Sequence, residues 1–114
     1  MMIPGVFVET PAFERERQTL WTDEEFQAFQ NFLMRNPEAG DVVPDTGGLR
    51  KVRFTQSSRG KGKRGGTRVI YFWQQSRHQF WLVSLFSKND KLDLSPHDRK
   101  ALREVLVRLI GDLH

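Results

Sequence analysis

Apolar residues recur at helical spacing near both ends of the chain, and in β-branched and aromatic runs between them. Residues 5–9 predict a short strand, and 11–20 predict a helix that opens with threonine and proline. Thr22 with Glu25 three positions later forms the pattern of a capping box. A second helix is therefore expected from this point, and it should end at Asn36, which precedes proline.

The period then changes from helical to extended. Residues 49–54 alternate between apolar and basic side chains, which is typical of a half-buried strand. Two longer runs, 67–73 and 79–86, are joined by a polar turn around 75–77 and predict a hairpin. Ser95, followed by proline and an acidic residue in the first turn, predicts the start of a last helix.

The order β-α-α-β-β-β-α indicates an α+β fold. We expect a mainly antiparallel sheet of three to four strands, with the helices packed on one face and the other face partly wet. The length of 114 residues suits one domain, 1–114. The absence of cysteine excludes a disulfide scaffold. No secretion signal or membrane-length apolar run is present, so a cytoplasmic location without a membrane partner is expected.

Charge is distributed unevenly along the chain. The net charge is only +4, yet residues 46–89 contain ten Lys and Arg and no Asp or Glu. The other 70 residues carry 8 bases and 14 acids. Such a basic block is typical of a surface that binds a polyanion, although a solvated basic face without a ligand is the alternative.

Within this block, residues 59–66 combine four glycines with four cations, so the segment can approach phosphates closely. Its glycine spacing matches the dinucleotide fingerprint by letter, but here it joins two expected strands instead of a strand and a helix. The P-loop sequence is also not matched. The three histidines are isolated, and without thiols no zinc pattern exists. We therefore predict neither a nucleotide cofactor nor a metal.

A cluster of Lys and Arg on a sheet suits one metal-independent reaction, the cleavage of RNA by attack of its own 2′-hydroxyl on the adjacent phosphate. The reaction needs a base, cations for the charge that builds on phosphate, and an acid at the leaving oxygen. Lys51, with Arg50, Arg53 and Arg68 expected nearby, could act as a base if its pKa is lowered. The alternative is that Lys51 and Arg53 form an ordinary polar strand face.

Three segments together resemble toxins of the RelE superfamily, particularly its HigB-like branch. They are residues 47–53 (GGLRKVR), 60–72 (GKGKRGGTRVIYF) and 85–90 (LFSKND). The resemblance implies the toxin of a type II toxin–antitoxin system, an mRNA interferase that cleaves mRNA in the ribosomal A site and inhibits translation. It also implies a cognate antitoxin, encoded adjacently and of helix-turn-helix type, and contacts to mRNA and rRNA on the ribosome.

Carried onto this chain, the resemblance implies catalytic roles for four residues. Lys51 and Arg53 match the paired bases of the first central strand, Arg68 matches the arginine that stabilises phosphate, and Lys88 matches a basic residue after the last strand. The residues expected to bind RNA or the ribosome are basic residues of the same block: Arg50, Arg59, Lys61, Lys63 and Arg64. The chain lacks the tyrosine that well-known members use near the final segment, so the general acid is not identified.

Two other functions remain open from the sequence. ParE-type toxins share the fold and poison DNA gyrase without cutting RNA. A non-catalytic RNA-binding module is the other alternative. The combination of Lys51, Arg53 and Arg68 favours the nuclease, since a gyrase inhibitor has no evident need for these three cations.

Overall fold

The computed structural model describes residues 5–55, 66–87 and 94–111. Helix α1 (Pro11–Leu20) and helix α2 (Asp23–Arg35) follow the short strand β1 (Val6–Glu9), and helix α3 (Pro96–Ile110) ends the described chain. Between them lie β2 (Asp41–Val42), β3 (Arg50–Phe54), β4 (Thr67–Gln74), the short helical turn η1 (Gln75–Arg77) and β5 (Gln79–Ser87). No helix of the described segments is both long and apolar enough to cross a membrane.

The helices begin where the sequence predicts. The Thr10 hydroxyl accepts a hydrogen bond from the Phe13 amide at the start of α1. Thr22 and Glu25 form the reciprocal capping box of α2, and Ser95 forms one with Asp98 at the start of α3. These caps satisfy amide groups that have no partner within the helix.

The five strands form one sheet in the order β1-β5-β4-β3-β2. Strands β2 to β5 pair antiparallel with their neighbours, whereas β1 pairs parallel with β5. The prediction of an α+β fold with a mainly antiparallel sheet is confirmed. The sheet has one strand more than the upper limit expected, because β2 is only two residues long and leaves no periodic signal in the sequence.

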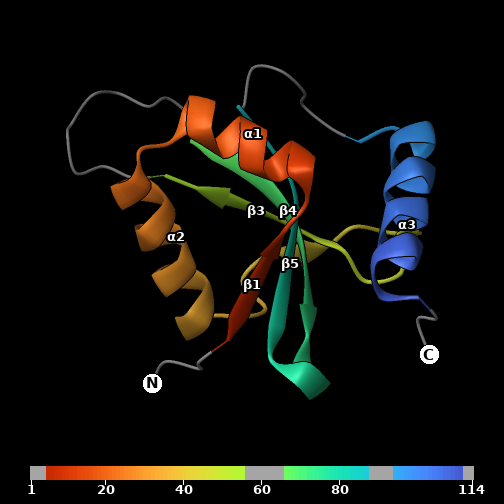
Figure 1. The fold of residues 1–114 in the computed structure, drawn as a ribbon. Helices are drawn as coiled ribbons and strands as arrows, with labels where there is room; N and C mark the ends of the chain where they lie inside the picture. The colour runs from red at the N-terminus through yellow and green to blue at the C-terminus, as the bar shows by residue number, and fades with distance from the viewer. Residues whose placement is uncertain (1–4, 56–65, 88–93, 112–114) are drawn as a thin grey trace.

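The helices lie on both faces of the sheet, which corrects the expectation that they would cover only one (Figure 1). Val69 and Tyr71 of β4 belong to the apolar cluster beneath α1 and α2. Ile70, between them, belongs to a second cluster with Leu106 of α3. Successive side chains of a strand point to opposite faces, so α3 covers the face that we expected to be partly wet.

Candidate nucleic-acid interface

The sheet brings three of the four predicted catalytic residues to the same face. On β3, Val52 is buried in the cluster beneath α1 and α2, so its neighbours Lys51 and Arg53 lie on the α3 face. Arg68 of β4 alternates with Val69 and lies on that face too. Arg53 and Arg68 are directly paired across the two strands. The residue types predicted to handle phosphate are therefore neighbours in the folded chain.

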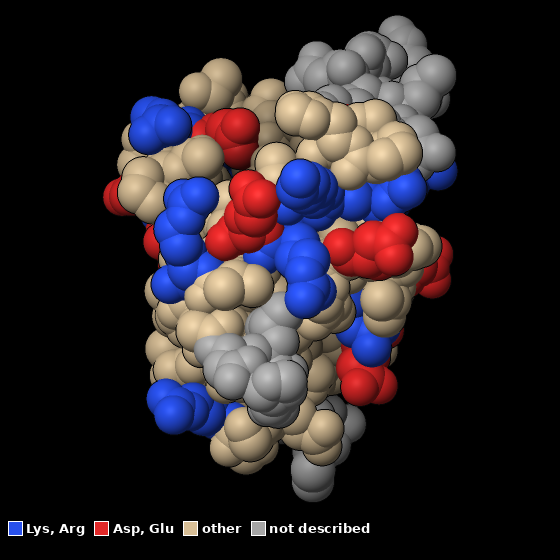
Figure 2. All heavy atoms as spheres, turned by 90° about the vertical axis from the view of Figure 1, so that its right-hand side faces the viewer, with Lys and Arg blue, Asp and Glu red and all other residues tan. Residues whose placement is uncertain are grey.

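Adjacent antiparallel partners have β-carbons about 4.5–5.5 Å apart. Arg53 is exposed, while Lys51 and Arg68 are half-buried. Positive charge is thus concentrated across two neighbouring strands. Figure 2 looks onto the side of the molecule that α3 occupies and shows Lys and Arg gathered there, with Asp and Glu among them. This arrangement suits a ligand with closely spaced negative charges.

The backbone where the described part of β4 begins requires glycine. Gly66 has a φ of +69°, and a β-carbon there would lie 2.2 Å from the Thr55 hydroxyl oxygen and 2.6 Å from the Phe54 carbonyl oxygen. The left-handed conformation and the close approach of the two strands both exclude a side chain. Gly66 therefore allows Arg68 to enter the sheet beside Arg53.

Arg50 lies on the other face of β3 from Lys51 and Arg53. Its guanidinium donates a 2.7 Å hydrogen bond to the Gly40 carbonyl and lies 3.9 Å from the Glu38 carboxylate. The structure thus does not bring Arg50 together with the three cations of the α3 face. Its role in RNA binding stays a prediction.

Tyr71 holds the same segment in place from β4. Its hydroxyl donates a 2.8 Å hydrogen bond to the Pro37 carbonyl and accepts one of 3.1 Å from the Gly40 amide. The side chain is fully buried. Burial raises the pKa of Tyr71 above its ordinary value of 10.0, against the opposing effect of the hydrogen bond from Gly40. Tyr71 and Arg50 together fix the chain that enters β2.

The remaining predicted residues lie outside the described segments. They are Lys88, predicted as a catalytic residue, and four cations predicted to bind RNA or the ribosome: Arg59, Lys61, Lys63 and Arg64. Their roles stay predictions.

The structure also shows a cation that the sequence analysis missed. Arg99 of α3 lines a small cleft together with Lys51 of β3. Nothing in the sequence pointed to this residue, because it lies outside the acid-free block. Only the docking of α3 on the sheet brings Arg99 to Lys51.

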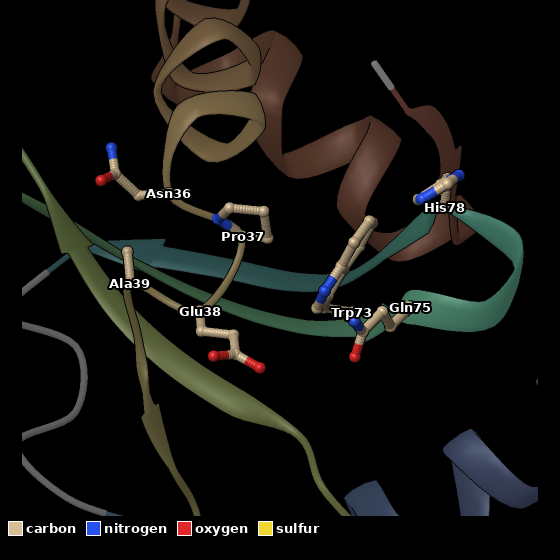
Figure 3. Close-up of a pocket in the computed structure, with 7 residues that line it drawn as sticks. All are labelled: Asn36, Pro37, Glu38, Ala39, Trp73, Gln75 and His78. Atoms are coloured by element: carbon tan, nitrogen blue, oxygen red, sulfur yellow. The ribbon is translucent and has the colours of Figure 1, made fainter. Parts of the chain in front are cut away.

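A larger cavity, of about 470 Å³, lies between the α2–β2 connection and the β4–β5 turn (Figure 3). Pro37 and Glu38 border it on one side, and Trp73, Gln75 and His78 border it on the other. Among the described residues, its lining includes a carboxylate and no Lys or Arg. This cavity therefore does not share the chemistry of the basic face.

The fold and the basic face define a small α+β domain with a sheet surface suited to a polyanion. The family model described as "RelE toxin of RelE / RelB toxin-antitoxin system" matches residues 10–111, and the chain belongs to this family. The HigB-like branch within the superfamily stays a prediction.

Solved structures share the fold at low sequence identity. A double arginine-to-alanine mutant of Escherichia coli RelE in the free state is similar, with a TM-score of 0.59 and 12% identity; the match covers 94% of this chain and 99% of that one. RelE in the intact E. coli RelBE toxin–antitoxin complex is similar with a TM-score of 0.52 and 16% identity, over 74% of this chain and 96% of that one. These likenesses support the fold.

Proposed function

We propose that this chain is the toxin of a type II toxin–antitoxin system and acts as a ribosome-dependent endoribonuclease that cleaves mRNA in the A site. The observation that carries the proposal is the pairing of Arg53 with Arg68 across adjacent strands, with Lys51 on the same face. Membership of the RelE toxin family supports the same conclusion.

The proposed reaction is metal-independent and uses the substrate's own nucleophile. The 2′-oxygen attacks the adjacent phosphorus, the bond from phosphorus to the 5′-oxygen breaks, and the products are a 2′,3′-cyclic phosphate and a 5′-hydroxyl. Lys51 is our candidate to take the proton from the 2′-hydroxyl. Arg53 and Arg68 stabilise the charge that develops on the phosphate oxygens, a role for which the guanidinium fork is suited. Lys88 is our candidate to protonate the leaving 5′-oxygen.

Binding to the ribosome accounts for the simplicity of this site. The three cations lie on the α3 face of the sheet and can stabilise charge, but they offer little to position a flexible RNA strand. If the ribosome holds the mRNA, the reacting groups are oriented before the toxin acts. Orientation of this kind substantially lowers the activation free energy of cleavage. The cations then need only complete the reaction.

The proposed partner is a cognate antitoxin, as the similar E. coli chain has in the RelBE complex. A segment that neutralises the basic face should present acidic groups together with apolar ones. We keep the prediction that this antitoxin is of helix-turn-helix type and is encoded adjacently.

The function is tested by expressing the chain under an inducible promoter and mapping mRNA ends by primer extension. We expect cuts in phase with codons that are lost in Lys51→Ala and Arg68→Ala. Arg77→Ala is the matched control, because Arg77 is an exposed arginine in the β4–β5 turn, and it should leave the cuts intact.

Other results would contradict the nuclease. Intact mRNA with induction of a DNA-damage response would indicate gyrase poisoning by a ParE-like toxin. RNA binding that Arg68→Ala weakens, without any cleavage by the wild-type chain, would indicate a non-catalytic RNA-binding module. Equal loss of cleavage in Arg68→Ala and Arg77→Ala would leave the nuclease in place but contradict the assigned site, because total charge would then account for the effect.

A further inference from the structure

A small cleft opens beside Lys51, between β2, the chain that follows it and the start of α3. Its volume is about 220 Å³, and its lining includes the Lys51 and Arg99 side chains together with Asp41 and Leu94. The two cations come from elements that are far apart in the sequence. The volume is below the range of about 300–1,000 Å³ that is usual for sites of small organic ligands, but it is several times the roughly 30 Å³ share of one water. The cleft therefore suits a single small anionic group.

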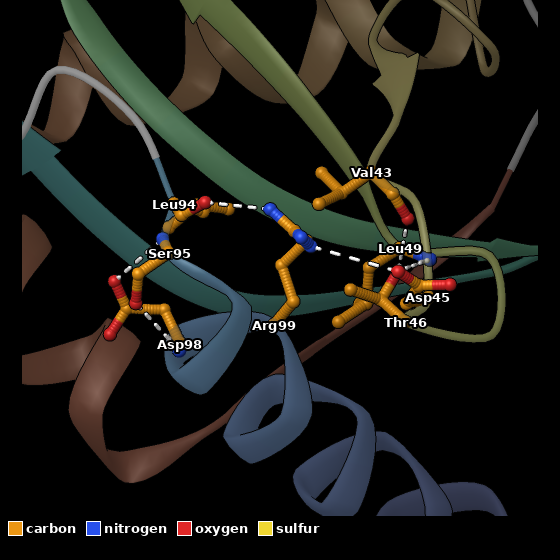
Figure 4. Close-up of polar contacts among 8 residues, drawn as sticks. All are labelled: Val43, Asp45, Thr46, Leu49, Leu94, Ser95, Asp98 and Arg99. Carbon is orange, nitrogen blue, oxygen red and sulfur yellow. Dashed lines mark hydrogen bonds and ion pairs between the residues drawn. The ribbon is translucent and has the colours of Figure 1, made fainter.

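The Arg99 guanidinium has five N–H donors, and one hydrogen bond, to a backbone carbonyl, holds it in place. Its Nη1 donates a 2.8 Å hydrogen bond to the Leu94 carbonyl. Its Nε is shielded from solvent and has no hydrogen-bond partner among the described residues. Asp45 Oδ2 lies 4.0 Å from Nε, which is an ion-pair contact beyond hydrogen-bond distance (Figure 4). Because Nε is shielded, a ligand in the cleft would be bound by the terminal N–H groups of the guanidinium, whose side chain is 24% exposed.

The cleft also adjoins the proposed catalytic residues. Lys51 lines the cleft and is two positions from Arg53 on β3, with both side chains on the α3 face. A single RNA strand carries one negative charge per nucleotide. When the scissile phosphate lies at Arg53 and Arg68, the next phosphate of the strand therefore also needs a binding site nearby. Contacts to such flanking phosphates fix the register of the strand.

We propose that Arg99 is a further substrate-binding residue, whose guanidinium binds a phosphate of the RNA backbone in the cleft that it lines together with Lys51. This inference rests on the proposed function and adds to it a residue from α3. The hydrogen bond to Leu94 pre-orients the guanidinium, which reduces the entropy lost on binding. Asp45 holds Arg99 only loosely, since its carboxylate lies 4.0 Å from Nε and its side chain is 81% exposed.

The test measures cleavage by the full-length toxin on ribosomes programmed with a defined mRNA, at single turnover over a range of toxin concentrations. Arg99→Gln should raise the half-saturating concentration by about tenfold or more, as expected for the loss of one charge-assisted contact. Arg103→Gln, an exposed arginine on the same helix, should change it by less than about twofold. A half-saturating concentration in Arg99→Gln equal to that of Arg103→Gln would overturn the inference.

Asp45→Asn distinguishes substrate binding from a merely structural role of Arg99. Asp45 has a φ of +67°, a conformation that asparagine also adopts readily, so the turn should be preserved. If Asp45 competes with phosphate for Arg99, Asp45→Asn should lower the half-saturating concentration. If Asp45 serves only as the counterion that keeps Arg99 folded in place, the same change should raise it, which would refute the inference even if Arg99→Gln failed to fold.

Lys51→Ala and Arg68→Ala are measured in parallel. Should the wild-type chain leave the mRNA intact, the proposed nuclease function itself fails. Should Lys51→Ala and Arg68→Ala both cleave as well as the wild-type chain, the assignment of these two residues to the site fails. Should both lose cleavage while Arg99→Gln retains wild-type saturation, the nuclease stands and only the role of Arg99 is rejected.

Discussion

Tyr71→Phe removes the hydroxyl oxygen whose two hydrogen bonds connect β4 to the chain that enters β2. The phenol is fully buried, donates to the Pro37 carbonyl at 2.8 Å and accepts from the Gly40 amide at 3.1 Å. Phenylalanine keeps the ring and its packing, so the change isolates the two hydrogen bonds. Gly40 is itself buried, and its amide would lose this partner without gaining water in its place.

The expected cost follows from this geometry. A buried donor left without a partner costs about 1–3 kcal/mol, whereas the carbonyl of half-buried Pro37 can be rehydrated. We therefore expect the free energy of unfolding to fall by about 1–3 kcal/mol. For a domain of this size the midpoint of thermal unfolding should fall by roughly 4 °C per kcal/mol. Urea unfolding followed by circular dichroism measures the change, and an unchanged urea midpoint would refute the argument.

The same residue predicts a pH dependence with a definite sign. Burial raises the pKa of Tyr71 in the folded state above the value of 10.0 that it has when exposed. The stabilisation is thus complete below about pH 10, and it is lost as pH rises toward the folded-state pKa, because the unfolded chain releases its proton first.

Tyr71 is the single tyrosine of the chain, so its ionisation can be followed directly by the ultraviolet absorbance of the phenolate. The slope of unfolding free energy against pH should be steeper in the wild-type protein than in Tyr71→Phe, by at most about 1.4 kcal/mol per pH unit above pH 10. Comparing the two proteins removes the contribution of lysines that titrate in the same range. Identical slopes, or a phenol that titrates at its ordinary pKa in the folded protein, would contradict the assignment.

Two further substitutions test the surroundings of the site. Thr46 is fully buried, and its hydroxyl donates to the Val43 carbonyl at 2.7 Å and accepts from the Leu49 amide at 3.1 Å. Thr46→Val should cost about 1–3 kcal/mol, seen as a lower urea midpoint with an unchanged m-value, and a neutral result would show that water replaces these bonds. Gly66→Ala should destabilise the protein more than Gly111→Ala does, since both glycines have positive φ but only Gly66 has atoms within 4 Å of the added carbon. Equal unfolding midpoints for the two alanine variants would show that the strands can move apart at no cost.

The parts of the fold that the sequence predicted well depend on local chemistry. A threonine or serine cap acts on an amide two or three residues away, so Thr22 and Ser95 could be identified by their neighbours alone. The alternation of Lys51, Val52 and Arg53 assigned the cations to one face of a strand for the same reason. These features need no knowledge of distant segments.

The position of α3 depends on packing between distant segments, and there the prediction was wrong. The run Val69–Trp73 has no polar residue on either face, which is typical of a strand buried on both sides. This signal was present in the sequence, but we expected one face of the sheet to be partly wet. The two-residue strand β2 gave no signal that could have been used.

The cations of the sheet and Arg99 of α3 are held in place by different parts of the structure, and this suggests different roles in the proposed function. Lys51, Arg53 and Arg68 are fixed by the hydrogen-bonded ladder of β3 and β4, so their relative positions depend on the most central part of the sheet. Arg99 depends instead on the docking of α3, whose fully buried contact is Leu106. In the proposed reaction, chemistry on the scissile phosphate therefore depends on the sheet, and the contact to the neighbouring phosphate depends on the docking of α3. We infer that residues of the sheet carry out the chemical step. Arg99 of α3, which packs on one face of the sheet, contributes to the affinity for RNA.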